Sequence, residues 1–346
     1  MASRKQTVLA IGGTGAQGVP VVKALTTDAK YNVHVLTRTA KSSAAEELAA
    51  LPGVTIIEGN PYDEETLARV FQGIDLAFVN INGFAIGEKA EVYWGIRMYE
   101  IAHWAGVKHF VWASIPYVSK LGGFDPQYRT GHMDGKGKVA AFVSAQPTQP
   151  MKWTILTSCM YMEMLSELLA PQPSAEDPDV FVFRAPLGHG AAPLIHLPDL
   201  GRYARWIFDT PAQSTGMDLD VATETIAWAD LAAAFTRVTG KKAIYVDITL
   251  DQLFASGAFP TPDAKVGHST DPNDPTLQTY RQNFSGFWRS WKAGIVVKDY
   301  AVLDRILPDR VKSVEEWMRR VGYTGEPRSV LKDYRDAAAA APAVKQ

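Results

Sequence analysis

The chain has 346 residues, of which 47% are hydrophobic and 21% charged, and its formal net charge is −2. This composition supports a large core and excludes a disordered chain. The length suggests one large domain or two closely associated ones. The near-neutral balance excludes an overall positive field for binding nucleic acid or an anionic membrane. A single cysteine, Cys159, excludes an intrachain disulfide and a cysteine-based zinc site.

The N-terminal stretch joins a few basic residues to a short apolar run that ends in glycines. We interpret this run as a strand rather than as a signal peptide. No uninterrupted apolar stretch reaches the roughly 18 residues of a membrane span. The sequence therefore predicts a cytoplasmic protein with no membrane or nucleic-acid partner.

The first half of the chain alternates short β-branched runs with segments of helical periodicity. This alternation predicts an α/β fold, a doubly wound parallel Rossmann sheet covered by helices on both faces. A ligand is then expected over the carboxyl ends of the strands. Strands are expected at 7–11, 33–37, 54–58, 76–80, 109–113 and 153–157, and helices at 19–25, 43–51, 64–71, 88–105 and 136–145.

The alternation becomes irregular after residue 158. Helices are expected at 161–170, 197–210 and 227–239, and strands at 181–184, 217–222 and 243–248. The Pro-, Asp- and Gly-rich residues 257–276 predict a long loop or lid. We expect a Rossmann domain over 1–158, a smaller α/β C-terminal substrate-binding region over 159–330 from which strands can return to the Rossmann sheet, and a tail over 331–346.

A glycine-rich turn follows the first expected strand and opens the first expected helix. One glycine permits the tight turn, Gly15 lets the backbone approach a pyrophosphate, and Gly18 lets helix and strand pack closely. The helix N–H groups then receive the phosphates. The alternative is a glycine turn that binds nothing. The residues expected to bind a dinucleotide here are Gly12, Thr14, Gly15, Ala16, Gln17 and Gly18.

Arg38 follows the second expected strand, about 20 residues beyond the glycine turn. An acidic residue at this place would hold the ribose 2′-hydroxyl of NAD, whereas arginine favours the 2′-phosphate of NADP. Lys41 lies within reach of the same group. The sequence therefore predicts NADP(H) as cofactor, with a solvated surface arginine as the alternative.

Several segments resemble the NmrA-like family of atypical short-chain dehydrogenases/reductases over roughly residues 7–325. They are IGGTGAQG, AEELAALPGVTIIEGNPYDEETLARVFQGIDLAFVN, VKHFVWASIP, GHMDGKGKV, HLPDLGRYARWIF and VEEWMRRVGYTG. The resemblance implies NADP(H) binding and, in GHMDGKGKV, a lysine near the nicotinamide, Lys136. The family that the chain resembles includes both NADP-dependent reductases and cofactor sensors that regulate partner proteins.

The polar residues after the third and fourth strands complete the expected cofactor contacts: Asn60, Asp63, Asn80 and Asn82. Asn60 stands where the family often has aspartate, and Asp63 is the substitute that we expect for the adenine contact.

Standard short-chain dehydrogenases use a serine on the fifth strand and a Tyr-x-x-x-Lys pair on the next helix, where the lysine lowers the tyrosine pKa. Ser114 and Tyr128 fit this pattern, but His132 stands in the place of the lysine, and Lys136 comes one turn later. On one helix, Tyr128, His132 and Lys136 would share a face. In one hypothesis the site is catalytic: Lys136 binds the ribose or acts as an acid, and Tyr128 or His132 could supply the proton. In the alternative, Lys136 only binds the cofactor and the site has no turnover.

Apolar residues near the expected site could contact a substrate, although core packing is the alternative for each. We predict Phe84, Tyr117, Tyr161 and Met162 as the substrate pocket. The histidines show no metal-ligand spacing, so no metal is expected. The predicted function is an NADPH-dependent reductase of an apolar or aromatic small molecule, with hydride transfer to a carbonyl, imine or activated double bond. The alternative is a non-catalytic NADP(H)-sensing regulator that binds a protein partner.

Overall fold

The computed structural model describes residues 4–331, so the expected tail at 331–346 lies outside the described residues apart from Leu331. The chain forms two compact units, which interleave along the sequence rather than meeting at one boundary near residue 158. Among the described residues, the first unit comprises 4–115 with Gly135–Ser158 and Leu197–Asp220, and the second comprises Pro116–Asp134, Cys159–His196 and 221–331.

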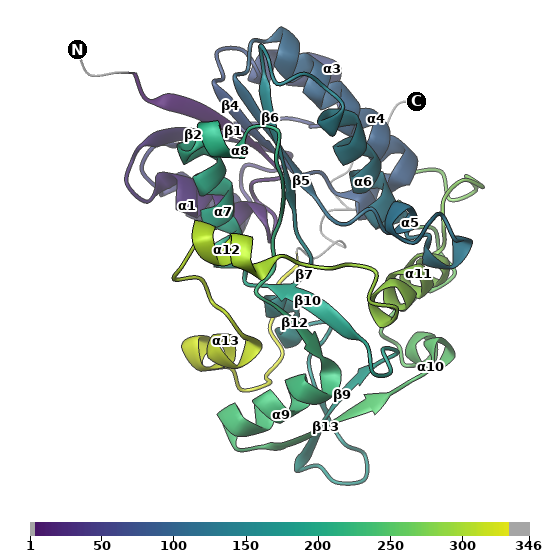
Figure 1. Ribbon diagram of the computed structural model, residues 1–346. Helices are drawn as coiled ribbons and strands as arrows, with labels where there is room; N and C mark the ends of the chain where they lie inside the picture. Colours follow the sequence, from purple (N-terminus) through teal and green to yellow (C-terminus); the bar gives the residue numbers. More distant parts are fainter. Residues whose placement is uncertain (1–3, 332–346) are drawn as a thin grey trace. The chain divides into compact units, whose positions relative to one another are not determined.

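A parallel sheet of seven strands forms the centre of the first unit (Figure 1). The strand order is β11-β6-β5-β4-β1-β2-β3, which confirms the predicted doubly wound Rossmann sheet. The order reverses between β1 and β4, and in such sheets a ligand site lies at this point. The strands are β1 (Gln6–Ile11), β2 (Tyr31–Thr37), β3 (Val54–Glu58), β4 (Leu76–Val79), β5 (His109–Ser114), β6 (Lys152–Thr157) and β11 (Asp218–Asp220).

Helices cover both faces of this sheet, with α1 and α7 on one side and α3, α4 and α6 on the other (Figure 1). Gly201 lets α7 approach α1 closely, because a Cβ there would lie 2.3 Å from the Pro20 carbonyl oxygen. The helices are α1 (Gly18–Thr26), α2 (Ser43–Ala49), α3 (Glu64–Val70), α4 (Gly83–Trp104), α6 (Gly131–Ser144, in this unit from Gly135), α7 (Leu197–Asp209) and α8 (Pro211–Ser214).

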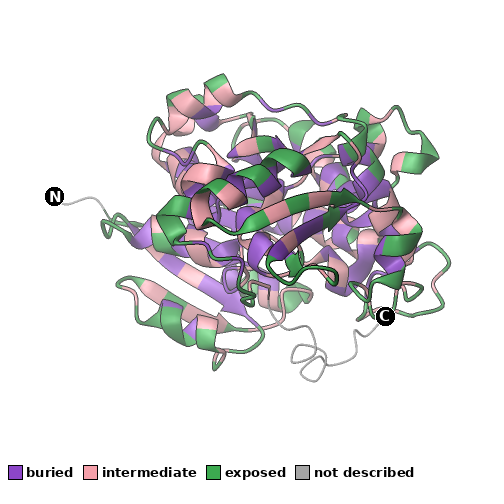
Figure 2. Cartoon of the chain, turned by 90° about the horizontal axis from the view of Figure 1, so that it is seen from below, coloured by how far each residue is buried: buried purple, intermediate pink, exposed green. Residues whose placement is uncertain are grey.

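The core of the first unit follows from the double covering of the sheet. Every residue of the central strands β4 and β5 is buried, whereas the edge strand β3 consists of half-buried and exposed residues. Figure 2 shows the buried positions concentrated along the strands. Central strands of a parallel sheet are apolar throughout because helices cover both of their faces.

Two three-stranded sheets and several short helices form the second unit. One sheet has the order β12 (Glu224–Ala227), β10 (Ala191–Ile195), β7 (Met160–Tyr161), and the other β13 (Lys242–Asp247), β9 (Val180–Ala185), β8 (Gln172–Pro173). The helices are α5 (Val118–Leu121), α9 (Trp228–Thr239), α10 (Leu250–Ala255), α11 (Tyr280–Lys292), α12 (Tyr300–Ile306) and α13 (Val314–Val321), with 3₁₀ turns at η1 (Pro126–Tyr128) and η2 (Met162–Ser166).

The structure corrects one expected helix and confirms one returning strand. The helix expected at 161–170 is wrong, because Met160 and Tyr161 pair in parallel with β10 and only a 3₁₀ turn follows. Part of the segment 217–222 returns as β11 and pairs with β6 in the first sheet. The helix expected at 88–105 is confirmed, and it is preceded by a short turn that ends at a kink, where Gly87 has φ 74°.

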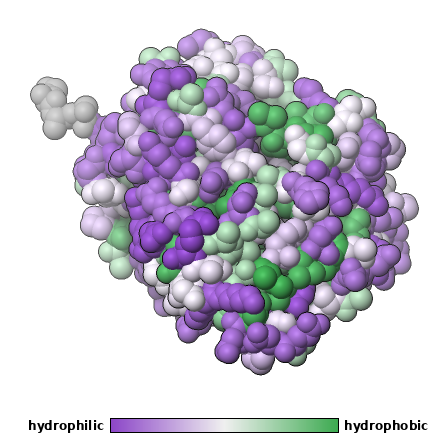
Figure 3. Space-filling view, turned by 60° about the horizontal axis from the view of Figure 1, so that its bottom comes forward, coloured by the Kyte–Doolittle hydropathy of each residue, from purple (hydrophilic) through white to green (hydrophobic). Residues whose placement is uncertain are grey.

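Polar side chains cover most of the face drawn in Figure 3, and apolar ones gather there in separate smaller areas. Scattered apolar surface of this kind is ordinary for a folded chain. Within residues 4–331, no helix has the length and apolar character needed to cross a bilayer.

Candidate functional site

The glycine turn between β1 and α1 is tightly packed at Gly12 and Gly18 and open at Gly15. Gly12 has φ 78°, and a Cβ there would lie 2.1 Å from the Asn80 carbonyl oxygen at the end of β4. A Cβ on Gly18 would lie 2.1 Å from the Gly12 carbonyl oxygen, whereas a Cβ on Gly15 would meet that oxygen only at 3.4 Å. Gly12 and Gly18 are therefore required by packing within the protein. Gly15 leaves open space at the N-terminus of a helix, and this fits a pyrophosphate.

The Gln17 side chain points into the protein rather than toward this open space. It is buried and donates from Nε2 to Ser158 Oγ at 3.2 Å. Ser158 Oγ in turn donates to the Ser114 carbonyl oxygen at 3.3 Å. The Ser114 hydroxyl, itself buried, donates to the Ile115 carbonyl oxygen at 3.2 Å. The Gln17 side chain thus fixes the turn against the ends of β5 and β6.

Exposed cationic residues follow β2. Arg38 and Lys41 are both exposed. Burial raises the pKa of Tyr62, which precedes α3, to about 12, and the charge of Arg38 acts to lower it. An exposed guanidinium at this place suits a phosphate partner.

Asn60 and Asp63 have local structural partners. Asn60 Oδ1 accepts from the Tyr62 N–H at 3.1 Å, which forms a turn before α3. Asp63 is the N-cap of α3 and accepts from the Thr66 N–H at 2.8 Å. Hydrogen bonds from Thr66 hold the pKa of Asp63 below its ordinary value. The adenine contact expected of Asp63 therefore competes with helix capping.

Lys136 lies on α6, and its ammonium reaches the end of β4, beside the backbone that the glycine turn contacts. Its ammonium donates to the Ile81 carbonyl oxygen at 2.7 Å and to Asn80 Oδ1 at 3.1 Å. It also forms an ion pair with Glu91 Oε1 at 3.0 Å, and only 13% of the Lys136 side chain is exposed. The Trp112 ring lies 5.2 Å from Nζ, and Trp112 Nε1 donates to the Lys136 carbonyl oxygen. Lys136 is a fixed positive charge at the point where the strand order reverses.

Asn82 and Phe84 begin α4 beside this charge. Asn82 is the N-cap and accepts from the Phe84 N–H at 3.0 Å. Its side chain therefore has a capping role, and Phe84 is half-buried in the first turn of the helix.

The expected shared face of Tyr128, His132 and Lys136 is wrong for Tyr128. Tyr128 ends the 3₁₀ turn η1, and Arg129 has ψ 122°, which interrupts the helix before α6 begins at Gly131. The Tyr128 ring packs on Gly122, where a Cβ would lie 2.3 Å from its Cδ2. His132 and Lys136 do lie on α6, one turn apart.

His132 has the contacts of a packed core histidine. It is buried, its backbone N–H donates to Asn283 Oδ1 at 3.2 Å, and its Nδ1 lies 2.8 Å from Asn283 Nδ2. The ring stacks on Phe284 with centroids 5.5 Å apart. These contacts favour a structural role over the proton donation that the sequence suggested.

Residues near α11 that sequence reasoning missed hold the segment before α6. Gln278 Oε1 accepts from the Gly131 N–H at 2.7 Å, and Gln278 Nε2 donates to the Arg129 carbonyl oxygen at 3.2 Å. A Cβ on Gly286 would lie 2.1 Å from that same carbonyl oxygen. Gln278 and Gly286, which lie in or next to a segment rich in aromatic residues, were the signal available in the sequence, but only the fold shows that they contact the backbone at Arg129 and Gly131.

The residues predicted for the substrate pocket have different surroundings. Phe84 belongs to the first unit, whereas Tyr117, Tyr161 and Met162 belong to the second. Tyr117 packs edge-on against Phe124, and both tyrosines are half-buried. Met162 is completely buried, so core packing accounts for it.

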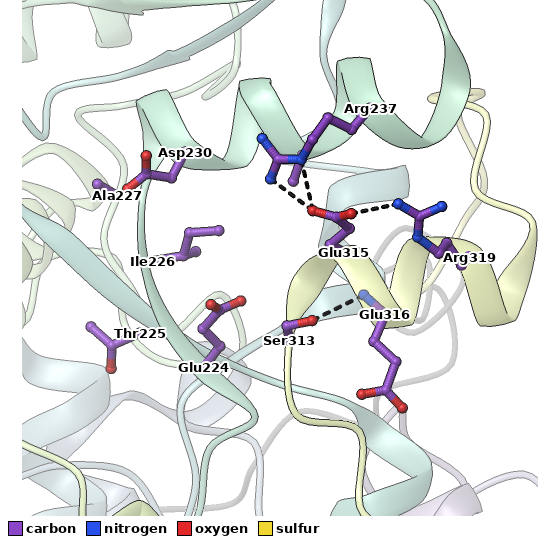
Figure 4. A pocket seen from close by; sticks show the side chains of 11 residues that line it. Glu224, Thr225, Ile226, Ala227, Asp230, Arg237, Ser313, Glu315, Glu316 and Arg319 are labelled. Atoms are coloured by element: carbon purple, nitrogen blue, oxygen red, sulfur yellow. Dashed lines mark hydrogen bonds and ion pairs between the residues drawn. The ribbon is translucent and has the colours of Figure 1, made fainter.

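A hollow of about 540 Å³ opens in the second unit between β12, α9 and α13 (Figure 4). Glu315 lies between Arg237 and Arg319, and both guanidinium groups hold its pKa below the ordinary value. None of the predicted site residues lines this hollow. Its charged groups form surface ion pairs, which are of little energetic weight, so the hollow is not the candidate site.

Comparison with known proteins finds relatives and solved structures that match most of the chain. An oxidoreductase of Aspergillus hancockii with an NmrA-like family domain is 29% identical over 262 residues, which are 72% of this chain and 77% of the relative. The structure of NmrA, a negative transcriptional regulator, in complex with NAD has a TM-score of 0.71 at 19% identity and covers 92% of this chain and 96% of its own. The NADPH complex of an NADPH-dependent quinone oxidoreductase from Escherichia coli has a TM-score of 0.67 at 17% identity, with coverage of 91% and 99%.

These two solved structures share the fold of this chain. The family model described as NmrA-like family matches residues 4–266, which include the glycine turn, Arg38 and Lys136. The chain belongs to the NmrA-like family.

Proposed function

We propose that the chain is an NADPH-dependent reductase that binds its cofactor at the ends of β1, β2 and β4. The observation that carries this proposal is the fixed ammonium of Lys136 beside the open glycine turn. The backbone of the turn and α1 bind the pyrophosphate, and Arg38 with Lys41 binds the 2′-phosphate. Relatives in the family are named oxidoreductases, and the quinone oxidoreductase of similar fold is described as NADPH-dependent.

The chemistry follows from the position of the charge. When bound, NADPH supplies the hydride. During reduction, negative charge develops on the oxygen of a carbonyl or quinone, or on the nitrogen of an imine. The Lys136 ammonium stabilises this charge, and it holds a proton at Nζ for transfer to that atom. The ammonium is already held by Asn80 and Ile81, so little reorganisation is needed during the reaction.

The substrate class is an apolar or aromatic small molecule. Support comes from the half-buried aromatic residues Phe84, Tyr117 and Tyr161, which flank the predicted site along the sequence. Aromatic and apolar linings with few polar groups are typical of such sites.

A second candidate function is an NADP(H)-sensing regulator that binds a protein partner. The observation that favours it is the complete engagement of the Lys136 ammonium by Ile81, Asn80 and Glu91. A related fold in complex with NAD belongs to a protein described as a negative transcriptional regulator.

Two measurements separate these functions. Calorimetry with NADPH and NADH tests the cofactor, and NADPH oxidation is followed at saturating cofactor with a panel of naphthoquinones, aromatic aldehydes and cyclic imines. Oxidation of NADPH by at least one class supports the reductase. NADPH binding without oxidation across the panel, together with a partner captured only in one redox state of the cofactor, supports the regulator and contradicts the reductase.

A further inference from the structure

Glu91 is a completely buried carboxyl group that the proposed reaction does not use. Its side chain is 0% exposed, and within the described residues neither carboxyl oxygen accepts a well-aligned hydrogen bond, although the Lys136 ammonium and the Gly83 N–H lie close enough to favour the carboxylate. The Lys136 ammonium, 3.0 Å from Oε1, forms an ion pair with it. A buried carboxylate is costly unless a charge compensates it, so the chain retains Glu91 here at an energetic cost.

Each of two helices, α4 and α6, has a glycine next to this carboxyl group, where a larger side chain would not fit. A Cβ on Gly83, at the start of α4, would lie 2.3 Å from Glu91 Oε2. A Cβ on Gly135, the residue before Lys136 in α6, would lie 2.7 Å from the same oxygen. Neither glycine has the left-handed backbone that would require glycine. The space itself therefore explains both glycines, and the packing fixes the carboxyl group next to the ammonium.

The other charged and titratable groups nearby are Glu88, Lys138, Tyr62 and Arg38. Glu88 pairs with Lys138 on the outer side of α6. Burial raises the pKa of Glu91, and Glu88 acts in the same direction, while Lys136 acts against both by favouring the carboxylate. Glu91 and Arg38 act in opposite directions on the pKa of Tyr62. Lys136 is thus the one cation with an ion pair to Glu91 among the described residues.

We propose that Glu91 is a positioning residue whose carboxylate is the buried counter-charge that holds the Lys136 ammonium at the end of β4 and sets its proton affinity. This inference rests on the proposed function, in which Lys136 acts on the substrate. The carboxylate holds the ammonium in place before hydride transfer, and it stays beside Nζ after the proton has passed to the substrate. No other atom is exchanged, since the proton passes from Nζ to the substrate.

The test measures the proton affinity of Lys136 directly, without cofactor or substrate. The full-length chain is labelled with trace acetic anhydride over roughly pH 6 to 11, a range around the ordinary lysine pKa of about 10.4, and acetylation of Lys136 and Lys138 is quantified by mass spectrometry. Removing an opposite charge at this distance lowers an ammonium pKa by about 1 to 3. Glu91→Gln should therefore move the Lys136 midpoint down by at least about 1 pH unit, which is a tenfold gain in labelling below the midpoint.

Two controls make the result specific. Glu88→Gln removes a neighbouring carboxylate that pairs with Lys138, and it should leave the Lys136 midpoint in place. Glu91→Asp keeps the charge and should retain most of the wild-type value. A folded Glu91→Gln chain with an unchanged Lys136 midpoint overturns the inference, because the carboxyl group would then already be neutral.

Should Glu91→Gln fail to fold, Gly135→Ala displaces the carboxylate without removing it. The inference then requires a lowered Lys136 midpoint in that variant, and an unchanged midpoint overturns it. Because the labelling needs no NADPH, a failure of the proposed reductase activity is distinguishable from a failure of this inference. Where turnover is found, Glu91→Gln should reduce kcat and shift its pH profile while leaving KM nearly constant.

Discussion

Gln17 donates from Nε2 to Ser158 Oγ at 3.2 Å, across 141 positions of the sequence. Ser158 Oγ then donates to the Ser114 carbonyl oxygen. This buried chain of hydrogen bonds joins the glycine turn to the ends of β5 and β6. The turn is therefore held in place by the protein itself, which lowers the ordering cost of ligand binding.

Gly15→Val should weaken cofactor binding strongly without unfolding the chain. A Cβ at Gly15 meets only the Gly12 carbonyl oxygen at 3.4 Å, so stability should stay within about 1 kcal/mol of wild type. The added side chain occupies the proposed pyrophosphate space, at a cost of about 1–3 kcal/mol, or roughly ten- to a hundredfold in NADPH affinity. Calorimetry and urea denaturation measure the two effects. Gly18→Ala, whose Cβ would lie 2.1 Å from the Gly12 oxygen, should instead lower stability. Wild-type NADPH affinity in Gly15→Val would place the phosphates elsewhere.

Arg38→Asp should reduce or reverse a preference for NADP(H) over NAD(H). A charge-assisted hydrogen bond contributes about 1.5–3 kcal/mol, so the preference of the wild type should be roughly ten- to a hundredfold. Isothermal calorimetry with NADP⁺ and NAD⁺ gives the ratio for both chains. Lys5→Asp makes the same charge change at an exposed position before β1 and should leave the ratio intact. Equal affinities of the wild type for both nucleotides contradict the assignment of Arg38.

Lys136→Ala should reduce turnover at least about a hundredfold, since a positioned acid contributes about 10²–10⁴-fold. Lys138→Ala should lose little, because Lys138 pairs with Glu88 and is 43% exposed. Steady-state NADPH oxidation with an accepted quinone, aldehyde or imine measures the effect, with NADPH affinity determined for each variant. The roles are assigned wrongly if Lys136→Ala turns over normally while Tyr128→Phe abolishes the reaction.

His132→Ala should mainly destabilise the fold. The substitution removes the contacts with Asn283 and Phe284 and leaves a buried gap, which together cost about 2–4 kcal/mol. Urea denaturation measures the loss, and turnover per folded molecule should remain near that of wild type. A stable His132→Ala chain without turnover would restore the catalytic role suggested by the sequence.

The stability of the chain should fall between about pH 6.5 and pH 4 because of His109. Burial, aided by the charge of Lys152, lowers the pKa of His109 to about 4. Thr154 Oγ1 donates to the Ser214 carbonyl oxygen, so it accepts from His109 Nε2, and the ring is neutral. The unfolded chain binds a proton below its ordinary pKa of about 6.5, so the free energy of unfolding decreases by about 3 kcal/mol as the pH falls through this window, and it levels off below it.

His109→Gln keeps a donor for Thr154 and should lack this part of the pH dependence. Urea denaturation at about pH 7 and about pH 5 compares the two chains within that window. His103→Gln, at an exposed position, is the matched control and should follow the wild type. Identical pH slopes for His109→Gln and wild type would show that His109 is not neutral in the folded state.

The sequence was sufficient for the Rossmann sheet because its signals are local. β-branched runs, the glycine turn and the returning segment around Leu219 each carry their own periodicity or punctuation. The site was harder to predict. Tyr128 fits a helical spacing, but the fold interrupts the helix at Arg129, where Gln278 and Gly286 hold the backbone.

Glu91 shows the same limit. A glutamate within a long helix is ordinarily exposed, and the space for its burial depends on Gly83 at the start of the same helix and on Gly135 from α6, a later part of the chain. Strands β10 and β12 were missed for a related reason, because short strands are defined by their pairing partners.

The interleaved units have a consequence for synthesis. Helix α7, which packs on α1, and strand β11, which covers the edge of β6, both follow residue 196. A nascent chain that has emerged only to residue 158 would expose the side of α1 that α7 covers in the full fold, and the unpaired edge of β6. Premature termination should therefore yield aggregation-prone fragments, so that the nucleotide-binding half becomes stable only after most of the message has been translated.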